Sequence, residues 1–223
     1  MRIYLSDAIE FVRARMDELP FNNDDMILPA EDDRNFDNTV GKLLPEAAEL
    51  VVRSAPANLL EPETEIFIPE VGYATEGIQS SSLLDDGAIR FIVPLDSGFL
   101  RFVSFKSTDS DIYVTQAAPY NSPEARMQAN PYTNGTYDDP VLVERKFPGS
   151  VEYTYYSVRS KSDVPGFTFS KIDRPSLADG GSIFCPEFLG PAVLNRLTGM
   201  VLDAYKETQL AQMFYQKSLT YIA

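Results

Sequence analysis

Apolar residues recur with a helical period at both ends of the chain, whereas its middle is rich in β-forming residues. The first helical face lies within residues 6–19 and consists of Ile9, Val12, Met16 and Leu19. Ser6 is a suitable N-cap for this helix, and Pro20 ends it. The order of helices, strands and helices predicts an α+β fold with a mostly antiparallel β-rich middle.

A second helix is expected to begin at one of three possible N-caps, which are Asp37, Asn38 and Thr39. Its broad apolar face consists of Val40, Leu43, Leu44, Ala47, Ala48, Leu50, Val51 and Val52. Pro45 lies inside this run, and proline lacks the amide proton that a helix interior uses. Either Pro45 begins a separate helix in its first turn or the helix kinks there. Pro56 ends the run.

The carboxyl-terminal region predicts one long helix. Its apolar stripe consists of Val193, Leu197, Met200, Ala204, Thr208, Ala211, Tyr215 and Leu219. A stripe of this length corresponds to roughly eight turns, or about 45 Å. We expect such a helix to span a whole subunit or to stack against a neighbouring one.

The middle of the chain predicts several strands. Residues 88–107 indicate two strands around Asp96, Ser97 and Gly98, and this pattern is typical of a hairpin. Further strands are expected within residues 65–73, 111–116, 141–147, 151–160 and 166–172. Neither face of the expected hairpin is purely polar, so it is either covered on both sides or packed on a partner. Residues 118–140 are rich in turn signals and form either a functional loop or an arm.

These patterns divide the chain into three ranges. Residues 1–60 form an N-terminal helical part, residues 61–175 a β-rich part containing the long loop 118–140, and residues 176–223 a helix that returns to the helical part. The interpretation is one compact helical core with a β insertion.

The residue inventory argues against most catalytic chemistry. The chain has no histidine, which removes the commonest general base and metal ligand, and its single cysteine, Cys185, is expected to be a small buried residue. The sequence therefore predicts no catalytic, cofactor-binding or metal-binding residues and no enzyme activity. The net charge of −14 argues against a nucleic-acid-binding surface, and no uncharged run is long enough to span a membrane.

The stretches KLLPEAAELVVRSAPANLLEP and LAQMFYQKSLTYIA resemble virion proteins of crAss-like bacteriophages, in particular their neck or tail ring proteins. The resemblance implies a subunit of a ring of twelve copies, stacked below the portal protein as a head–tail connector. Such a ring lines the channel for DNA and ejected proteins, without binding DNA specifically. The resemblance also implies a location in the virion after synthesis in the host bacterial cytoplasm. It transfers no catalytic residues to this chain.

Two groups of residues are the candidates for contacts in such a ring. We expect an acidic loop to face the lumen or an adjoining ring, and it contains Asp24, Asp25, Glu31, Asp32 and Asp33. The candidates for contact between subunits are Asp96, Ser97, Gly98, Phe99, Tyr132, Asn134 and Tyr137. A covered sheet and a loosely held loop are the alternatives for these segments. The alternative functions are a monomeric ligand- or glycan-binding module and a hydrolase that uses two carboxylates.

Overall fold

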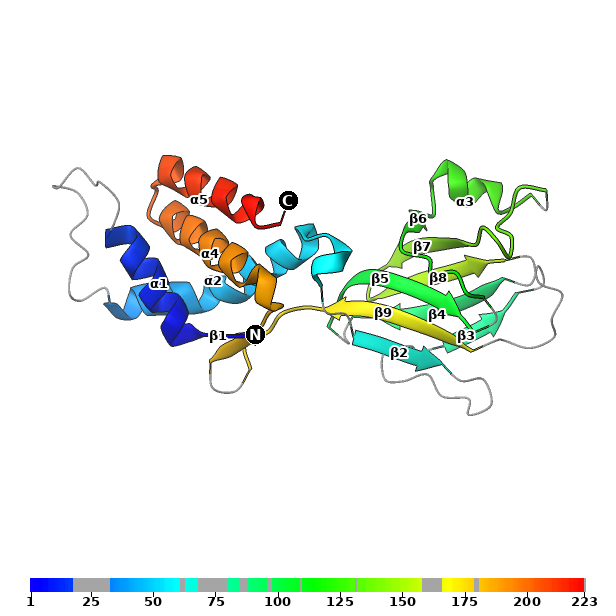
Figure 1. Cartoon of the computed structure of the whole chain (residues 1–223), viewed down its shortest axis with the longest axis horizontal. Helices are drawn as coiled ribbons and strands as arrows, with labels where there is room; N and C mark the ends of the chain where they lie inside the picture. The colour runs from blue at the N-terminus through cyan, green and yellow to red at the C-terminus, as the bar shows by residue number, and fades with distance from the viewer. Residues whose placement is uncertain are drawn as a thin grey trace. The chain divides into compact units, whose positions relative to one another are not determined.

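The chain is α+β and divides into two compact units, which are described separately (Figure 1). The computed structural model describes residues 1–17, 33–60, 63–67, 80–84, 88–95, 98–108, 110–130, 132–157, 166–178 and 181–222. The helical unit combines Met1–Glu61 with Pro175–Ala223, and the β unit is Pro62–Arg174. The sequence patterns place the divisions at residues 60–61 and 175–176, each within one residue of the boundaries of these units.

The helical unit is built from four long helices and a small sheet. The helices are α1 (Leu5–Asp17), α2 (Asp33–Ser54), α4 (Gly190–Ala204) and α5 (Thr208–Thr220). Strands β1 (Arg2–Tyr4) and β10 (Ser182–Phe184) pair antiparallel, and the short helices are η2 (Ala57–Leu59) and η5 (Glu187–Leu189). Buried residues repeat along each helix and make the core; they include Ala8, Val12, Met16, Val40, Leu44, Val51, Val193, Leu197, Val201, Ala211 and Phe214.

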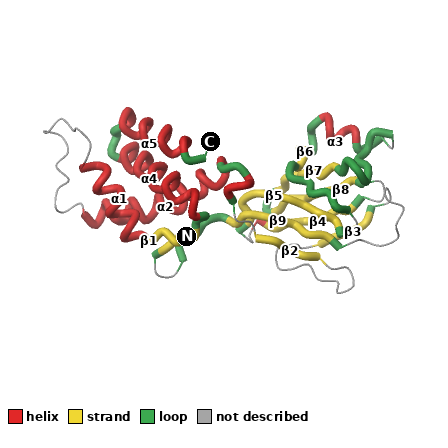
Figure 2. The backbone as a smooth tube through the Cα atoms, in the orientation of Figure 1, coloured by secondary structure: helices red, strands yellow, loops and turns green. Residues whose placement is uncertain are grey.

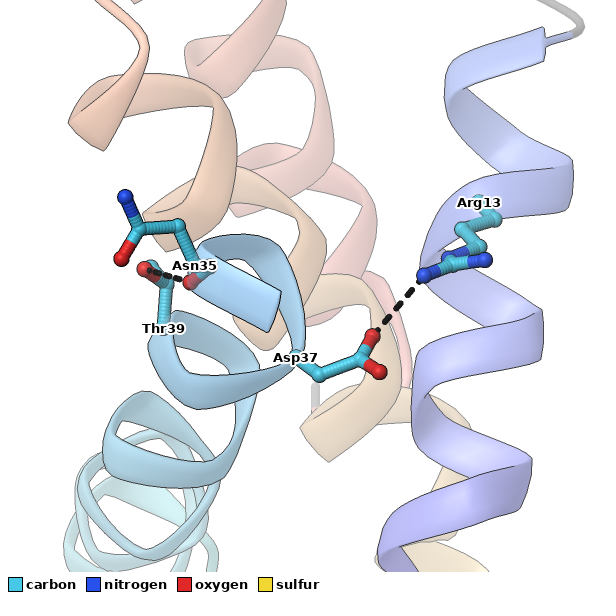
Figure 3. A network of polar contacts seen from close by, with 4 residues as sticks. All are labelled: Arg13, Asn35, Asp37 and Thr39. Atoms are coloured by element: carbon cyan, nitrogen blue, oxygen red, sulfur yellow. Dashed lines mark hydrogen bonds and ion pairs between the residues drawn. The ribbon is translucent and has the colours of Figure 1, made fainter. Parts of the chain in front are cut away.

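Helix α2 starts earlier than expected and is not divided at Pro45. It begins at Asp33, and the expected cap residues lie inside it, where the Thr39 hydroxyl donates to the carbonyl oxygen of Asn35 at 2.8 Å (Figure 3). Arg13 of α1 forms an ion pair with Asp37 at 2.9 Å, which links the first two helices (Figure 3). Of the two alternatives for Pro45, the one in which it begins a separate helix is excluded, because helical residues precede and follow it.

The prediction of one long C-terminal helix is also wrong. The helix stops at Ala204, and Lys206 adopts a positive φ of 68° before α5 begins. Helix α5 then folds back along α4, and the Ser218 hydroxyl donates to the carbonyl oxygen of Ala192 at 2.8 Å (Figure 1). The apolar stripe is divided between the two helices: Val193, Leu197 and Ala211 are buried, whereas Leu219 is 53% exposed.

The β unit contains two sheets (Figure 2). The first has the order β2 (Glu63–Phe67), β9 (Phe167–Asp173) and β5 (Phe99–Ser107). The second has the order β3 (Ser80–Leu83), β4 (Ile89–Pro94), β8 (Ser150–Tyr156), β7 (Val141–Phe147) and β6 (Ala117–Pro119). All neighbouring strands are antiparallel except β6 and β7, which are parallel.

Aromatic side chains from both sheets form the core of the β unit. Phe91 of β4 lies at its centre, with ring centroids 5.3 Å from Phe105 of β5 and 5.0 Å from Phe167 of β9. Tyr153 of β8 is also buried there, and its hydroxyl donates to a carboxylate oxygen of Glu144 at 3.0 Å. Burial, together with the negative charge of Glu144, raises the pKa of Tyr153. Both sheets therefore contribute to one apolar interior.

The hairpin expected at residues 88–107 does not form, although both of its strands do. Strand β4 pairs with β3 and β8, whereas β5 pairs with β9 in the other sheet. The connection carries the chain from one sheet to the other, which lets Phe91 and Phe105 stack across the interior. Residues 111–116 contribute only an isolated bridge between Val114 and Phe105. The strands at 141–147, 151–160 and 166–172 form close to the expected positions.

Candidate interaction surface

Much of the expected acidic loop and of the expected turn lies outside the described residues. This applies to Asp24, Asp25, Glu31 and Asp32, and to Asp96 and Ser97. Asp33 is the first residue of α2. Gly98 has a positive φ of 82°, a conformation that glycine adopts without strain.

Phe99 belongs to the core and not to a contact surface. Its side chain is only 5% exposed, and its ring centroid lies 6.3 Å from Phe169 and 6.5 Å from Tyr153. Phe99 is the first residue of β5 and is already paired with Asp173 of β9 in the three-stranded sheet. Its selection as a contact residue was wrong because the alternating pattern does not say which face of a strand is covered.

The segment 117–140 is folded, and a short helix organises its first half. The helix α3 (Pro123–Met127) has Ser122 as its N-cap, whose hydroxyl accepts a hydrogen bond from the Ala125 amide at 3.2 Å. Pro123 occupies the first helical turn, where a missing amide proton has no cost. The sequence Ser-Pro-Glu is a recognisable helix start, and it is the signal that could have predicted α3.

The Gln128 side chain joins the two halves of this segment. Gln128 is buried, and its side-chain nitrogen donates to the carbonyl oxygen of Glu124 at 2.8 Å. Its side-chain oxygen accepts a hydrogen bond from the buried amide of Gly135 at 2.7 Å. The Gln128 side chain thus bonds an acceptor four residues before it and a donor seven residues after it, which holds the turn against the helix.

Gly135 packs tightly against the five-stranded sheet. A Cβ atom at this position would collide with the carbonyl oxygen of Tyr156 and would lie 2.8 Å from the amide nitrogen of Val141. Only glycine allows this close approach of two backbones. The turn around Asn134 and Gly135 is therefore held on the ends of β7 and β8.

The folded segment presents large apolar side chains to solvent. Tyr132 is 94% exposed, Tyr120 53%, Met127 52% and Tyr137 50%. We call Tyr120, Met127, Tyr132 and Tyr137 the aromatic surface. The Thr133 hydroxyl donates to the carbonyl oxygen of Met127 at 2.9 Å, and the Tyr132 amide donates to the Asn130 side chain at 3.0 Å. Two of the expected contact residues, Tyr132 and Tyr137, belong to this surface, whereas Asn134 is half-buried.

No three His, Cys, Asp or Glu side chains among the described residues gather closely enough to hold a metal ion. Cys185 is fully buried, as expected, and its thiol lies 3.4 Å from the carbonyl oxygen of Pro186. Three tyrosines of the segment 117–140 are exposed in the β unit, and tyrosine is a residue type enriched at protein-binding surfaces.

No helix in the described part of the chain is long and apolar enough to cross a membrane. No protein-family model matches the chain, and no curated protein sequence is significantly similar to it.

Proposed function

We propose that the chain is a virion structural protein, a subunit of a ring in the neck or tail of a phage. In this role twelve copies form a head–tail connector below the portal protein, and the ring lines the channel for DNA and ejected proteins. The proposal includes synthesis in the host bacterial cytoplasm and a final location in the virion.

The aromatic surface on the folded segment 117–140 is the observation that supports this proposal. Tyrosine is enriched among the residues that dominate protein–protein binding energy. Hydrogen bonds from Gln128 and Thr133 already order the backbone of the segment, so binding orders little besides side chains. Exposed tyrosines on an ordered backbone are more typical of a segment that binds another protein than of a loop that only contacts solvent.

The net charge of −14 fits a channel through which DNA passes. A surface of the same sign as the phosphate backbone repels it, so the DNA does not adhere to the wall. The proposal assigns no specific DNA-binding residue.

The experiment is to measure the size of assemblies by mass photometry and electron microscopy, for the chain alone and with the phage's portal protein. We expect rings of about twelve subunits, because the portal of a tailed phage has twelvefold symmetry in the proposed arrangement. Tyr132→Ala is expected to weaken the assembly by about thirtyfold, the effect typical of a dominant interface residue. Tyr4→Ala is the matched control, because Tyr4 is an exposed tyrosine of the helical unit.

A chain that stays monomeric under both conditions would contradict the proposal and favour a ligand-binding module. If Tyr132→Ala forms rings as well as the wild type does, the proposed ring assembly is retained, but the aromatic surface does not contribute to it.

A further inference from the structure

Asn134 and Gly135 form the sequence pair in which an asparagine loses its side-chain amide most readily. In this reaction the main-chain nitrogen of the glycine attacks the side-chain carbonyl carbon of the asparagine. A cyclic imide forms, and ammonia leaves with the proton of the attacking nitrogen. Water then opens the imide at either of its two carbonyls, which leaves aspartate or isoaspartate. Glycine favours the attack because it has no side chain to shield its nitrogen and its backbone rotates freely.

The Gln128 side chain occupies the position that the reaction needs. The buried amide of Gly135 donates to the side-chain oxygen of Gln128 at 2.7 Å. In the imide, the side-chain carbon of Asn134 replaces the hydrogen on this nitrogen, and in the native segment the Gln128 oxygen already lies in that direction. The nitrogen must therefore leave its hydrogen bond before it attacks, and an unsatisfied buried donor is costly.

Packing prevents the backbone from turning this amide away from Gln128. A Cβ atom at position 135 would collide with the carbonyl oxygen of Tyr156 and would lie 2.8 Å from the amide nitrogen of Val141, so the main chain has no room to move toward the sheet. On the other side of the peptide, the Asn134 amide donates to the carbonyl oxygen of Asn130 at 3.0 Å. The attack therefore requires the segment 117–140 to open locally first.

We propose that Asn134 is a deamidation site that Gln128 keeps unreactive in the folded chain and that local opening of the segment 117–140 exposes. The site lies within a single chain and does not depend on the proposed ring. Its test can therefore fail while the proposed function stands, and the proposed function can fail while the site stands.

The modification is irreversible and changes the aromatic surface. Either product places a new carboxylate two residues after Tyr132. Isoaspartate also carries the main chain through its side-chain carbon, so the backbone gains one atom directly before Gly135. Because Gly135 already lies tightly against the backbone of Tyr156 and Val141, we expect the lengthened segment not to regain its native contacts.

The test is mass spectrometry of the full chain after incubation in mildly alkaline buffer. Trypsin cleaves after Arg126 and Arg145 and so releases residues 127–145 as one peptide. The other asparagine in this peptide, Asn130, precedes Pro131, whose nitrogen carries no hydrogen. Asn130 is therefore an internal control that cannot react by the same route.

The deamidation rate is compared for the folded wild type, the wild type unfolded in urea, and two folded variants. We expect the folded wild type to react more slowly than the unfolded chain, by the same factor that hydrogen exchange gives for the protection of the Gly135 amide. Gln128→Leu should react about five- to 150-fold faster than the folded wild type. Thr133→Val loses only an exposed hydrogen bond and should react as the wild type does. Circular dichroism checks that both variants are folded.

Equal rates for the folded and the unfolded wild type would overturn the proposal, whether or not the variants fold. A rate in Gln128→Leu equal to that in Thr133→Val would remove Gln128 from the protection and overturn it as well. Products that contain aspartate without isoaspartate would exclude attack by the Gly135 nitrogen. No reaction in the unfolded chain would show that Asn134 is not a deamidation site.

Discussion

Replacing Gln128 with leucine should loosen the segment 117–140 without unfolding the β unit. Leucine is similar in size to glutamine but offers no hydrogen bond. The variant leaves the buried amide of Gly135 without its acceptor, which lies at 2.7 Å in the native chain, and the carbonyl oxygen of Glu124 without its donor. The loss at Gly135 is the larger one, because this amide is buried whereas Glu124 is exposed.

The expected magnitude follows from the cost of an unsatisfied buried donor. Such a group costs about 1–3 kcal/mol. If the segment opens locally, this cost lowers the protection of the Gly135 amide against hydrogen exchange by about five- to 150-fold. The core around Phe91 is unchanged, so amides in the central strands β4 and β8 should keep their protection.

Hydrogen exchange measured by NMR is the assay, because it reports on each amide separately. Thr133→Val, an isosteric change in the same segment, is the matched control. It removes the exposed hydrogen bond to the Met127 carbonyl and should have the smaller effect. Limited proteolysis between residues 129 and 139 should rank the variants in the same order.

An unchanged exchange rate at Gly135 in Gln128→Leu would refute the reasoning. It would mean that the contacts of Gly135 with the sheet, and not the Gln128 side chain, keep the segment closed. Loss of protection throughout β4 and β8 would also refute it, because the segment would then be part of the cooperative core.

Three further predictions concern the cores of the two units. Phe91→Ala should destabilise the β unit by about 3–5 kcal/mol in urea unfolding, and a loss below about 1 kcal/mol would show that the aromatic core is not continuous. Gly199→Ala places a Cβ 2.5 Å from the nearest atom of the Tyr215 ring and should cost about 1–2 kcal/mol in the same assay, despite its gain in helix propensity, so a more stable variant would contradict the packing of α4 on α5. Burial and the hydrogen bond to Asp203 raise the pKa of Tyr215 from 10.0 to about 12. The folded protein therefore binds the proton of the Tyr215 hydroxyl more tightly than the unfolded chain does. The stability that this provides is complete below pH 10 and is lost as the pH rises to about 12. Tyr215→Phe should lack this component of alkaline destabilisation, and identical pH profiles for the two proteins would contradict it.

Local periodicity was sufficient to predict the element types in much of the chain. The spacing of apolar residues in α1 and the alternation in β7 and β9 each reflect a repeat of the backbone itself, which any sequence with that pattern shares. The burial of Cys185 was predictable from the residue inventory, because a chain without histidine has no imidazole to activate the thiol.

The pairing of elements was not predictable in this way. The stripe through 193–219 has the same period whether the helix continues or turns back at Lys206, and the strands at 89–94 and 99–107 alternate equally well within one sheet or across two. Which arrangement forms depends on partners far along the chain, such as β8 and β9, and on the rings that fill the space between the sheets.

The candidate surface shows the same division. The sequence by itself determined that residues 118–140 are rich in turns and contain Tyr120, Tyr132 and Tyr137. Only the tertiary structure decided that Gln128 fastens this segment, that Gly135 rests on the sheet, and that Arg145 stacks between Tyr120 and Phe147. The physical reason is that a single polar side chain carries no periodic signal. Its role is set by the donors, acceptors and rings that the folded chain brings within a few ångströms of it.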